Sequence, residues 1–155
     1  MIDILIIEIQ SFLRTNFREH EGDEIIEKDL LPEKKKNAVS IMRVNHCGEV
    51  CAQALYRAQM LFAQSSTFKS TLQQMADEEL EHLIITKRRL NELHGKQSKF
   101  NPLFYISSFI LGSIFAAKSD QLSRGFLKET EKQVQLHLKK FILKAKEIDL
   151  SLIHI

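Results

Sequence analysis

The chain has 155 residues, a length that fits one domain. Its net charge of +2, with 27% charged and 44% hydrophobic residues, is too even for a nucleic-acid-binding protein. With only five glycines and two prolines, the composition favours a few long helices over a many-stranded sheet.

Hydrophobic periodicity predicts five helical segments, at residues 2–18, 34–64, 67–94, 103–117 and 121–146. A polar run ends the second segment, and we expect Thr67 to cap the third, which Gly95 should terminate. The expected organisation is an N-terminal helix with an acidic linker, a helical domain and a short tail, at residues 1–33, 34–148 and 149–155.

The apolar N-terminus and the two cysteines help to predict the cellular compartment of the protein. The first nine residues carry Asp3 and Glu8 and lack a basic leader, so we do not expect a signal peptide. Cys47 and Cys51 lie four residues apart on one side of a predicted helix. We expect them to be free thiols of a reducing compartment, in the cytosol or on the cytoplasmic side of a membrane.

Three predicted helices each place one glutamate on the stripe that should face inward. The aligned residues are Asn45, Glu49, Ala52, Tyr56, Gln59 and Ala63; Leu72, Met75, Glu79, His82, Thr86, Leu90 and Leu93; and Leu127, Glu131, Val134, Leu138 and Phe141. We expect Tyr56 and Met60 to serve core packing only. A buried carboxylate costs several kcal/mol unless it is compensated. No stripe supplies a lysine or arginine, whereas one metal centre could compensate all three glutamates.

Glu79 and His82 sharpen the metal hypothesis. Residues three apart share a helix face, so this Glu-x-x-His pair can reach one metal ion while the glutamate bridges to a second. Of the six histidines, only His82 follows a glutamate at this spacing. The spacing also arises in solvated helices that bind nothing. From the residues alone, a metal site and a metal-free interface both remain open.

Four stretches resemble the demethoxyubiquinone hydroxylase family, in the family's order and spacing over residues 41–138. They are MRVNHCGEVCAQALY at 42–56, ADEELEHL at 76–83, NPL at 101–103 before the apolar segment, and GFLKETEKQV at 125–134 followed by His137-Leu138. The resemblance implies an all-α, ferritin-like four-helix bundle that holds two iron ions. It also implies that the apolar segment 103–117 is an extra helical segment on a membrane surface, with a buried core helix as the alternative.

The resemblance also implies a role for each matching residue. Glu49 is expected as the single ligand from the first ligand helix, and Glu131 as the carboxylate from the later one. Glu79 would bridge the two irons, and His82 would bind one of them. These are the same acids that the inward stripes contain.

Two further histidines fall near the expected centre. His46 precedes Glu49 by three residues and shares its face, so we expect a hydrogen-bonded core histidine or a partner of the metal ligands, in preference to a ligand. His137 matches a family position near the site, where substrate binding or proton transfer is conceivable. An interfacial histidine is the equal alternative for His137.

The family's activity is the hydroxylation of a polyprenylated demethoxyubiquinol during ubiquinone biosynthesis. The resemblance therefore implies a 3-demethoxyubiquinol 3-hydroxylase, a di-iron monooxygenase that uses molecular oxygen and an external electron donor. It implies a peripheral protein on the cytoplasmic side of the cell membrane, in possible contact with other ubiquinone-biosynthesis proteins.

The chain departs from the family pattern in one respect. The family has a second Glu-x-x-His pair on a further bundle helix, and no such pair follows Leu138 here. We therefore expect the last bundle helix to be missing, the tail after Asp149 to lie outside the family pattern, and this chain alone to be inactive. Two other classes remain open: a ferritin-like iron-binding protein, and a metal-free helical interaction module.

Overall fold

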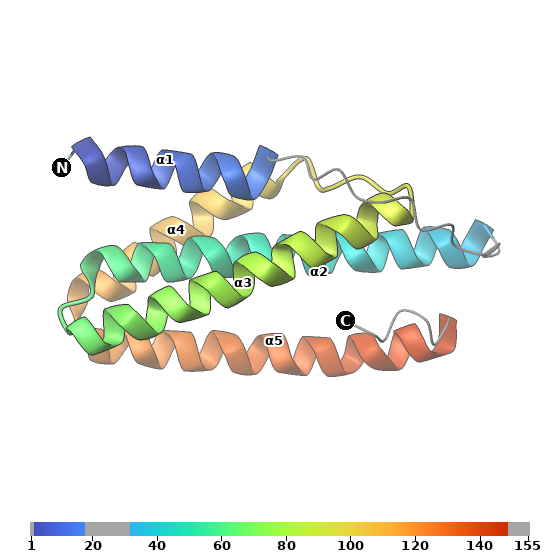
Figure 1. Ribbon diagram of the computed structural model, residues 1–155. Helices are drawn as coiled ribbons and strands as arrows, with labels where there is room; N and C mark the ends of the chain where they lie inside the picture. The colour runs from blue at the N-terminus through green and yellow to red at the C-terminus, as the bar shows by residue number, and fades with distance from the viewer. Residues whose placement is uncertain (1, 18–31, 149–155) are drawn as a thin grey trace.

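The computed structural model describes residues 2–17 and 32–148. These residues form five helices, α1 (Ile2–Phe17), α2 (Pro32–Phe62), α3 (Ser66–Glu92), α4 (Asn101–Lys118) and α5 (Asp120–Ile148) (Figure 1). Within this part of the chain there is no strand, so the predicted all-α helical bundle is confirmed. Most of the predicted acidic linker, and the tail at 149–155, lie outside the described residues, so the predicted division of the chain stays a prediction.

Helix α2 is the centre of the bundle, because each of the other four helices packs against it. It runs antiparallel to α3, to which a short turn connects it (Figure 1). Helix α4 approaches α2 closely at Gly112, where a Cβ atom would lie only 2.9 Å from the carbonyl oxygen of Leu55. A larger residue there would push the two helices apart.

The ends of α3 differ from the prediction by a residue or two. Ser65, not Thr67, caps its N-terminus, and the Ser65 hydroxyl accepts a hydrogen bond from the amide of Phe68. At the other end His94, not Gly95, takes the left-handed conformation, with φ 53°. The amide of Gly95 then donates to the carbonyl of Leu90 over 2.8 Å, which closes the helix.

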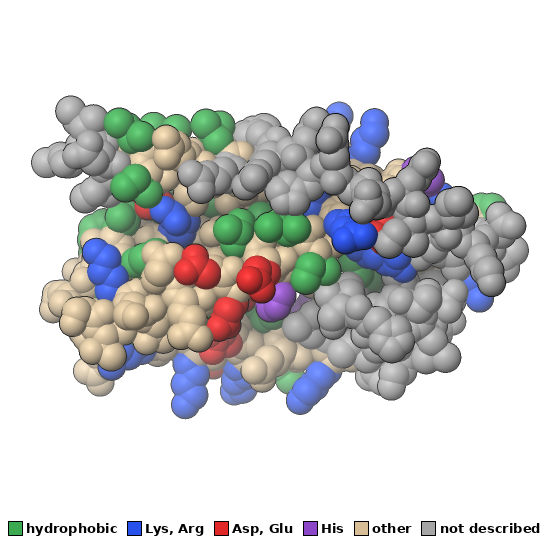
Figure 2. Space-filling model, in the orientation of Figure 1, with side chains coloured by type: hydrophobic (Ala, Val, Ile, Leu, Met, Phe, Trp, Pro, Cys, Tyr) green, Lys and Arg blue, Asp and Glu red, His purple; other side chains and the backbone are tan. Residues whose placement is uncertain are grey.

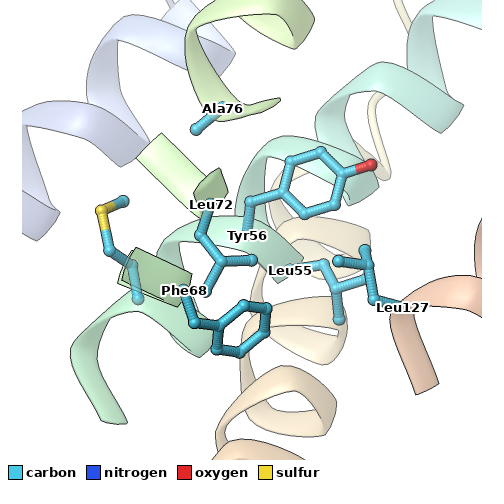
Figure 3. Close-up of a cluster of buried hydrophobic side chains, with 7 residues drawn as sticks. Leu55, Tyr56, Phe68, Leu72, Ala76 and Leu127 are labelled. Atoms are coloured by element: carbon cyan, nitrogen blue, oxygen red, sulfur yellow. The ribbon is translucent and has the colours of Figure 1, made fainter. Parts of the chain in front are cut away.

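Three clusters of buried side chains hold the helices together. The largest joins α2, α3 and α5 through Leu55, Tyr56, Met60, Phe68, Leu72, Ala76 and Leu127 (Figure 3). A second joins the start of α2 to the end of α3, and a third joins α2 and α3 to Tyr105 of α4. The core is therefore built along the whole of α2 and α3.

The predicted inward stripes hold only in part. On α3, Leu72, Thr86 and Leu90 are buried, but the His82 side chain is 56% exposed. The stripe thus opens to solvent in its middle. On α5 the prediction is wrong at Val134, which is 53% exposed. The side chains of the last two residues of that stripe lie outside those described.

Helix α4 turns most of its apolar side chains away from the core. It buries Asn101, Tyr105, Gly112 and Ala116 and exposes Leu103, Phe104, Ile106, Ile110, Leu111 and Ile114. The alternative of a buried core helix is therefore wrong. Neighbouring α1 also exposes apolar side chains, at Ile6, Ile7, Ile9 and Leu13. None of the described helices has the length and apolar character needed to span a membrane.

Candidate metal centre

A cavity of about 820 Å³ lies between α2, α3 and α5, with Ser108 of α4 also in its lining. Five glutamates line it, Glu49, Glu78, Glu79, Glu129 and Glu131. None of the described residues that line it is a lysine or arginine. Figure 2 shows acidic side chains gathered beside one histidine in the middle of the face shown. The cavity therefore concentrates negative charge without a basic side chain to balance it.

Glu49 of α2 and Glu79 and His82 of α3 converge. One ligand atom of each lies within 4.8 Å of the other two. On α3, the Nδ1 of His82 lies 3.4 Å from the Oε2 of Glu79, as the spacing of three residues predicts. Sequence reasoning thus identified three residues that the fold brings together from two helices.

The protonation of Glu49 shows how unfavourable the charge in the cavity is. Burial, together with the hydrogen bond and the negative charge of Glu79, raises the pKa of Glu49 to about 9. Burial and the charge of Glu79 also raise the pKa of Glu131. Two carboxylates and an imidazole suit a divalent metal such as iron, so the residues present fit a metal ion.

Glu131 and His137, both on α5, line the same cavity. Glu131 is half-buried and lies outside the group of converging ligand atoms, whereas His137 is exposed. The structure therefore places Glu131 close enough to Glu79 for their charges to interact. Ligation by Glu131 and a role for His137 stay predictions.

His46 is fully buried behind the centre. Its Nδ1 lies 3.1 Å from the hydroxyl of Thr86, and its Nε2 lies 3.0 Å from the side-chain oxygen of Gln97. The Thr86 hydroxyl is also 2.9 Å from the backbone carbonyl of His82. Burial lowers the pKa of His46. His46 is therefore a hydrogen-bonded core residue that supports the turn of α3 carrying His82, in agreement with the sequence-based expectation.

Sequence reasoning did not assign Glu78, Glu129, Tyr56 or Cys51 to the site, although all four line the cavity. Tyr56 packs in the core, as expected, and it also lines the cavity. The signal was present, since Tyr56 follows Glu49 by seven residues on one helix face. Cys51 also lines the cavity. Both cysteines are free, and the hydrogen bond with Cys47 lowers the pKa of the Cys51 thiol to about 6.

Comparison with known proteins gives a consistent set of relatives. A family model described as ubiquinone biosynthesis protein COQ7 matches residues 36–150. Proteins of Chromobacterium violaceum, Dechloromonas aromatica and Laribacter hongkongensis, each named 3-demethoxyubiquinol 3-hydroxylase, are 47%, 43% and 42% identical to the chain. The alignments cover 89%, 88% and 96% of this chain, and 70%, 69% and 75% of the respective relatives. No solved structure matches the chain.

Proposed function

The chain belongs to the ubiquinone biosynthesis protein COQ7 family, and from this premise we propose that it acts as a 3-demethoxyubiquinol 3-hydroxylase. The observation that carries the proposal is the convergence of Glu49, Glu79 and His82 beside a cavity that Glu49, Glu79 and three further glutamates line. Family membership supplies the substrate, a polyprenylated demethoxyubiquinol, and the cavity supplies a place for the metal that the reaction needs.

The residues that would hold iron are Glu49 of α2, Glu79 and His82 of α3, and Glu131 of α5. The second Glu-x-x-His pair that the family pattern needs for two irons does not occur in this sequence. Bound iron would supply the activation of molecular oxygen, which no amino-acid side chain provides. Two electrons from an external donor and two protons balance the reaction, with one oxygen atom entering the ring and the other leaving as water.

The rest of the cavity suits a substituted aromatic ring beside the carboxylates. Val44, Ala52, Leu55 and Phe126 line it with apolar side chains, which would exclude water from the ring and hold it by contact. His137, on the α5 wall, would bind a ring hydroxyl or transfer its proton. The chain's own residues thus orient the ring, while the glutamates hold the metal.

The proposed activity is tested directly by turnover. With ferrous iron, a reductant and molecular oxygen, we expect the chain extended by a helix with a second Glu-x-x-His pair to convert a short-chain demethoxyubiquinol to the hydroxylated product, and the present chain alone to stay inactive. If the oxygen gas is isotopically heavy, one heavy atom should appear in the ring. An anaerobic sample is the control. Iron-loaded protein that reduces oxygen without labelling the ring would contradict the proposal.

We further propose that the exposed apolar face of α4 and α1 rests on the cytoplasmic surface of the cell membrane, where the greasy substrate resides. In support, six large apolar side chains of α4 face solvent. Lys96 and Lys99 precede this helix and Lys118 ends it, where their ammonium groups could meet lipid phosphates. The protein would lie on the surface as a peripheral protein.

A double substitution tests membrane binding. Ile106→Asp with Ile110→Asp places two charges where the side chains are 49% and 54% exposed. Each buried isoleucine is worth about 1.5–3 kcal/mol, so vesicle binding should fall at least about tenfold. Flotation with anionic vesicles measures this, with Ile85→Asp on α3, at 45% exposure, as the matched control. Equal flotation of the double variant and the control would rule this face out.

A further inference from the structure

Gln97 lies in the connection between α3 and α4, and its side chain reaches back to α2. Its Oε1 lies 3.0 Å from the Nε2 of His46. A second contact holds the same connection against α2, because the Nε of Arg43 donates to the backbone carbonyl of Lys96 over 2.8 Å. The fold around Gln97 therefore keeps its side chain beside the imidazole of His46.

The imidazole of His46 has one hydrogen to share between two partners. The residue is fully buried, and the amide of Gln97 and the hydroxyl of Thr86, which contact its two nitrogens, are uncharged. A charged ring would be costly there, so the ring is neutral and carries its proton on one nitrogen only. An amide oxygen can only accept a hydrogen bond, so the oxygen of Gln97 places that proton on Nε2. The other nitrogen, Nδ1, is then an acceptor.

The hydroxyl of Thr86 has three acceptors within reach and only one hydrogen. Its oxygen lies 3.1 Å from the Nδ1 of His46, 2.9 Å from the carbonyl oxygen of His82 and 3.1 Å from that of Leu83. With the imidazole proton on Nε2, the hydroxyl donates to Nδ1. With the proton on Nδ1, the hydroxyl accepts there and donates to the carbonyls of α3, a bond to the preceding turn that often bends a helix. The tautomer of His46 therefore sets the geometry of the turn that carries His82.

We propose that Gln97 is a positioning residue of the metal centre. Its oxygen keeps the proton of His46 on Nε2, so that the Thr86 hydroxyl bonds to Nδ1 instead of the carbonyl of His82. A bend of α3 at this turn would move His82 relative to Glu49 of α2, with which it shares the cation. The inference rests on the metal centre of the proposed function and extends it to a residue that neither belongs to the converging ligands nor lines the cavity.

Gln97→Met keeps the length of the side chain and removes its oxygen. We expect the imidazole proton to move to Nδ1, where the Thr86 hydroxyl accepts it. Nitrogen-15 NMR of metal-free protein measures this, because protonated and unprotonated ring nitrogens resonate far apart. Among the histidines that the structure describes, His46 alone is buried, so its slowly exchanging ring proton identifies its signal.

The same substitution should weaken metal binding. We expect the affinity of Gln97→Met for cobaltous ion, titrated into metal-free protein by visible absorption, to fall about 2–30-fold. Thr86→Val removes the hydroxyl that transmits the change. In that background Gln97→Met should have no further effect on cobalt affinity, whereas two independent losses would add. Gln73→Met, at an exposed position of α3, is the matched control and should change neither the tautomer nor the affinity.

The outcomes separate this inference from the proposed function. An imidazole proton on Nδ1 in the wild type would overturn the inference and leave the metal centre standing. A tautomer change without weaker cobalt binding, or a loss of affinity that persists in full without the Thr86 hydroxyl, would do the same. If wild-type protein binds no cation, the metal centre and the positioning role both fail. A changed tautomer, with a loss of affinity that depends on Thr86, supports the inference.

Discussion

Glu79→Gln should abolish iron binding and, with it, hydroxylation. Glu79 lies at the centre of the site, because its carboxylate meets both Glu49 and His82 and its charge acts on Glu131. The amide keeps the size of the side chain but loses the charge and one acceptor oxygen. Loss of a supporting residue typically costs 10–100-fold in metal affinity, so loss of this ligand should cost more than about 100-fold. Ferrous titration and product analysis measure the two losses.

Glu81→Gln is the control for this experiment. Glu81 lies between the two ligands of α3 but is exposed and does not line the cavity. It carries the same charge on the same turn, so a general electrostatic effect would appear in both variants. Comparable iron affinity in the two proteins would mean that Glu79 is not a ligand.

The convergence of Glu49, Glu79 and His82 could be predicted because it follows from helical geometry. Steps of three and four residues fix which side chains share a face, and two long amphipathic helices joined by a short turn pack face to face. The same reasoning placed every described helix to within about two residues of its ends. The spacing of residues along single helices was therefore enough to predict both the fold class and the three central residues of the candidate site.

The remaining errors concern which side chains of neighbouring helices pack against a given residue. Tyr56 falls on a correctly predicted stripe, yet the stripe does not show that its ring is buried while its hydroxyl reaches a cavity. Val134 also falls on a stripe, and it is exposed because the packing of α5 on its neighbours does not cover it. Periodicity describes one helix at a time, whereas burial depends on the elements packed against it.

The protonation of Glu49 makes the stability of the metal-free protein fall as pH rises. Its pKa is about 9 in the folded protein, against an ordinary value of 4.5. Between these values the folded state binds more protons than the unfolded state, so the free energy of unfolding decreases with pH. The slope for a single group cannot exceed about 1.4 kcal/mol per pH unit. Denaturant titrations of metal-free protein across this range measure it.

Glu49→Gln should act on stability and on metal binding in opposite directions. An amide cannot ionise, so the metal-free variant should lose this pH dependence and gain stability at about pH 8, by about 2–4 °C in thermal midpoint for each kcal/mol. Its iron affinity should fall, because a carboxylate ligand is gone.

Glu33→Gln, at an exposed position near the start of the same helix, is the control and should change neither stability nor iron affinity. A metal-free Glu49→Gln protein no more stable than wild type would show that Glu49 is not strained in the folded state. A gain in stability together with a loss of iron affinity would show that Glu49 destabilises the metal-free fold and serves metal binding.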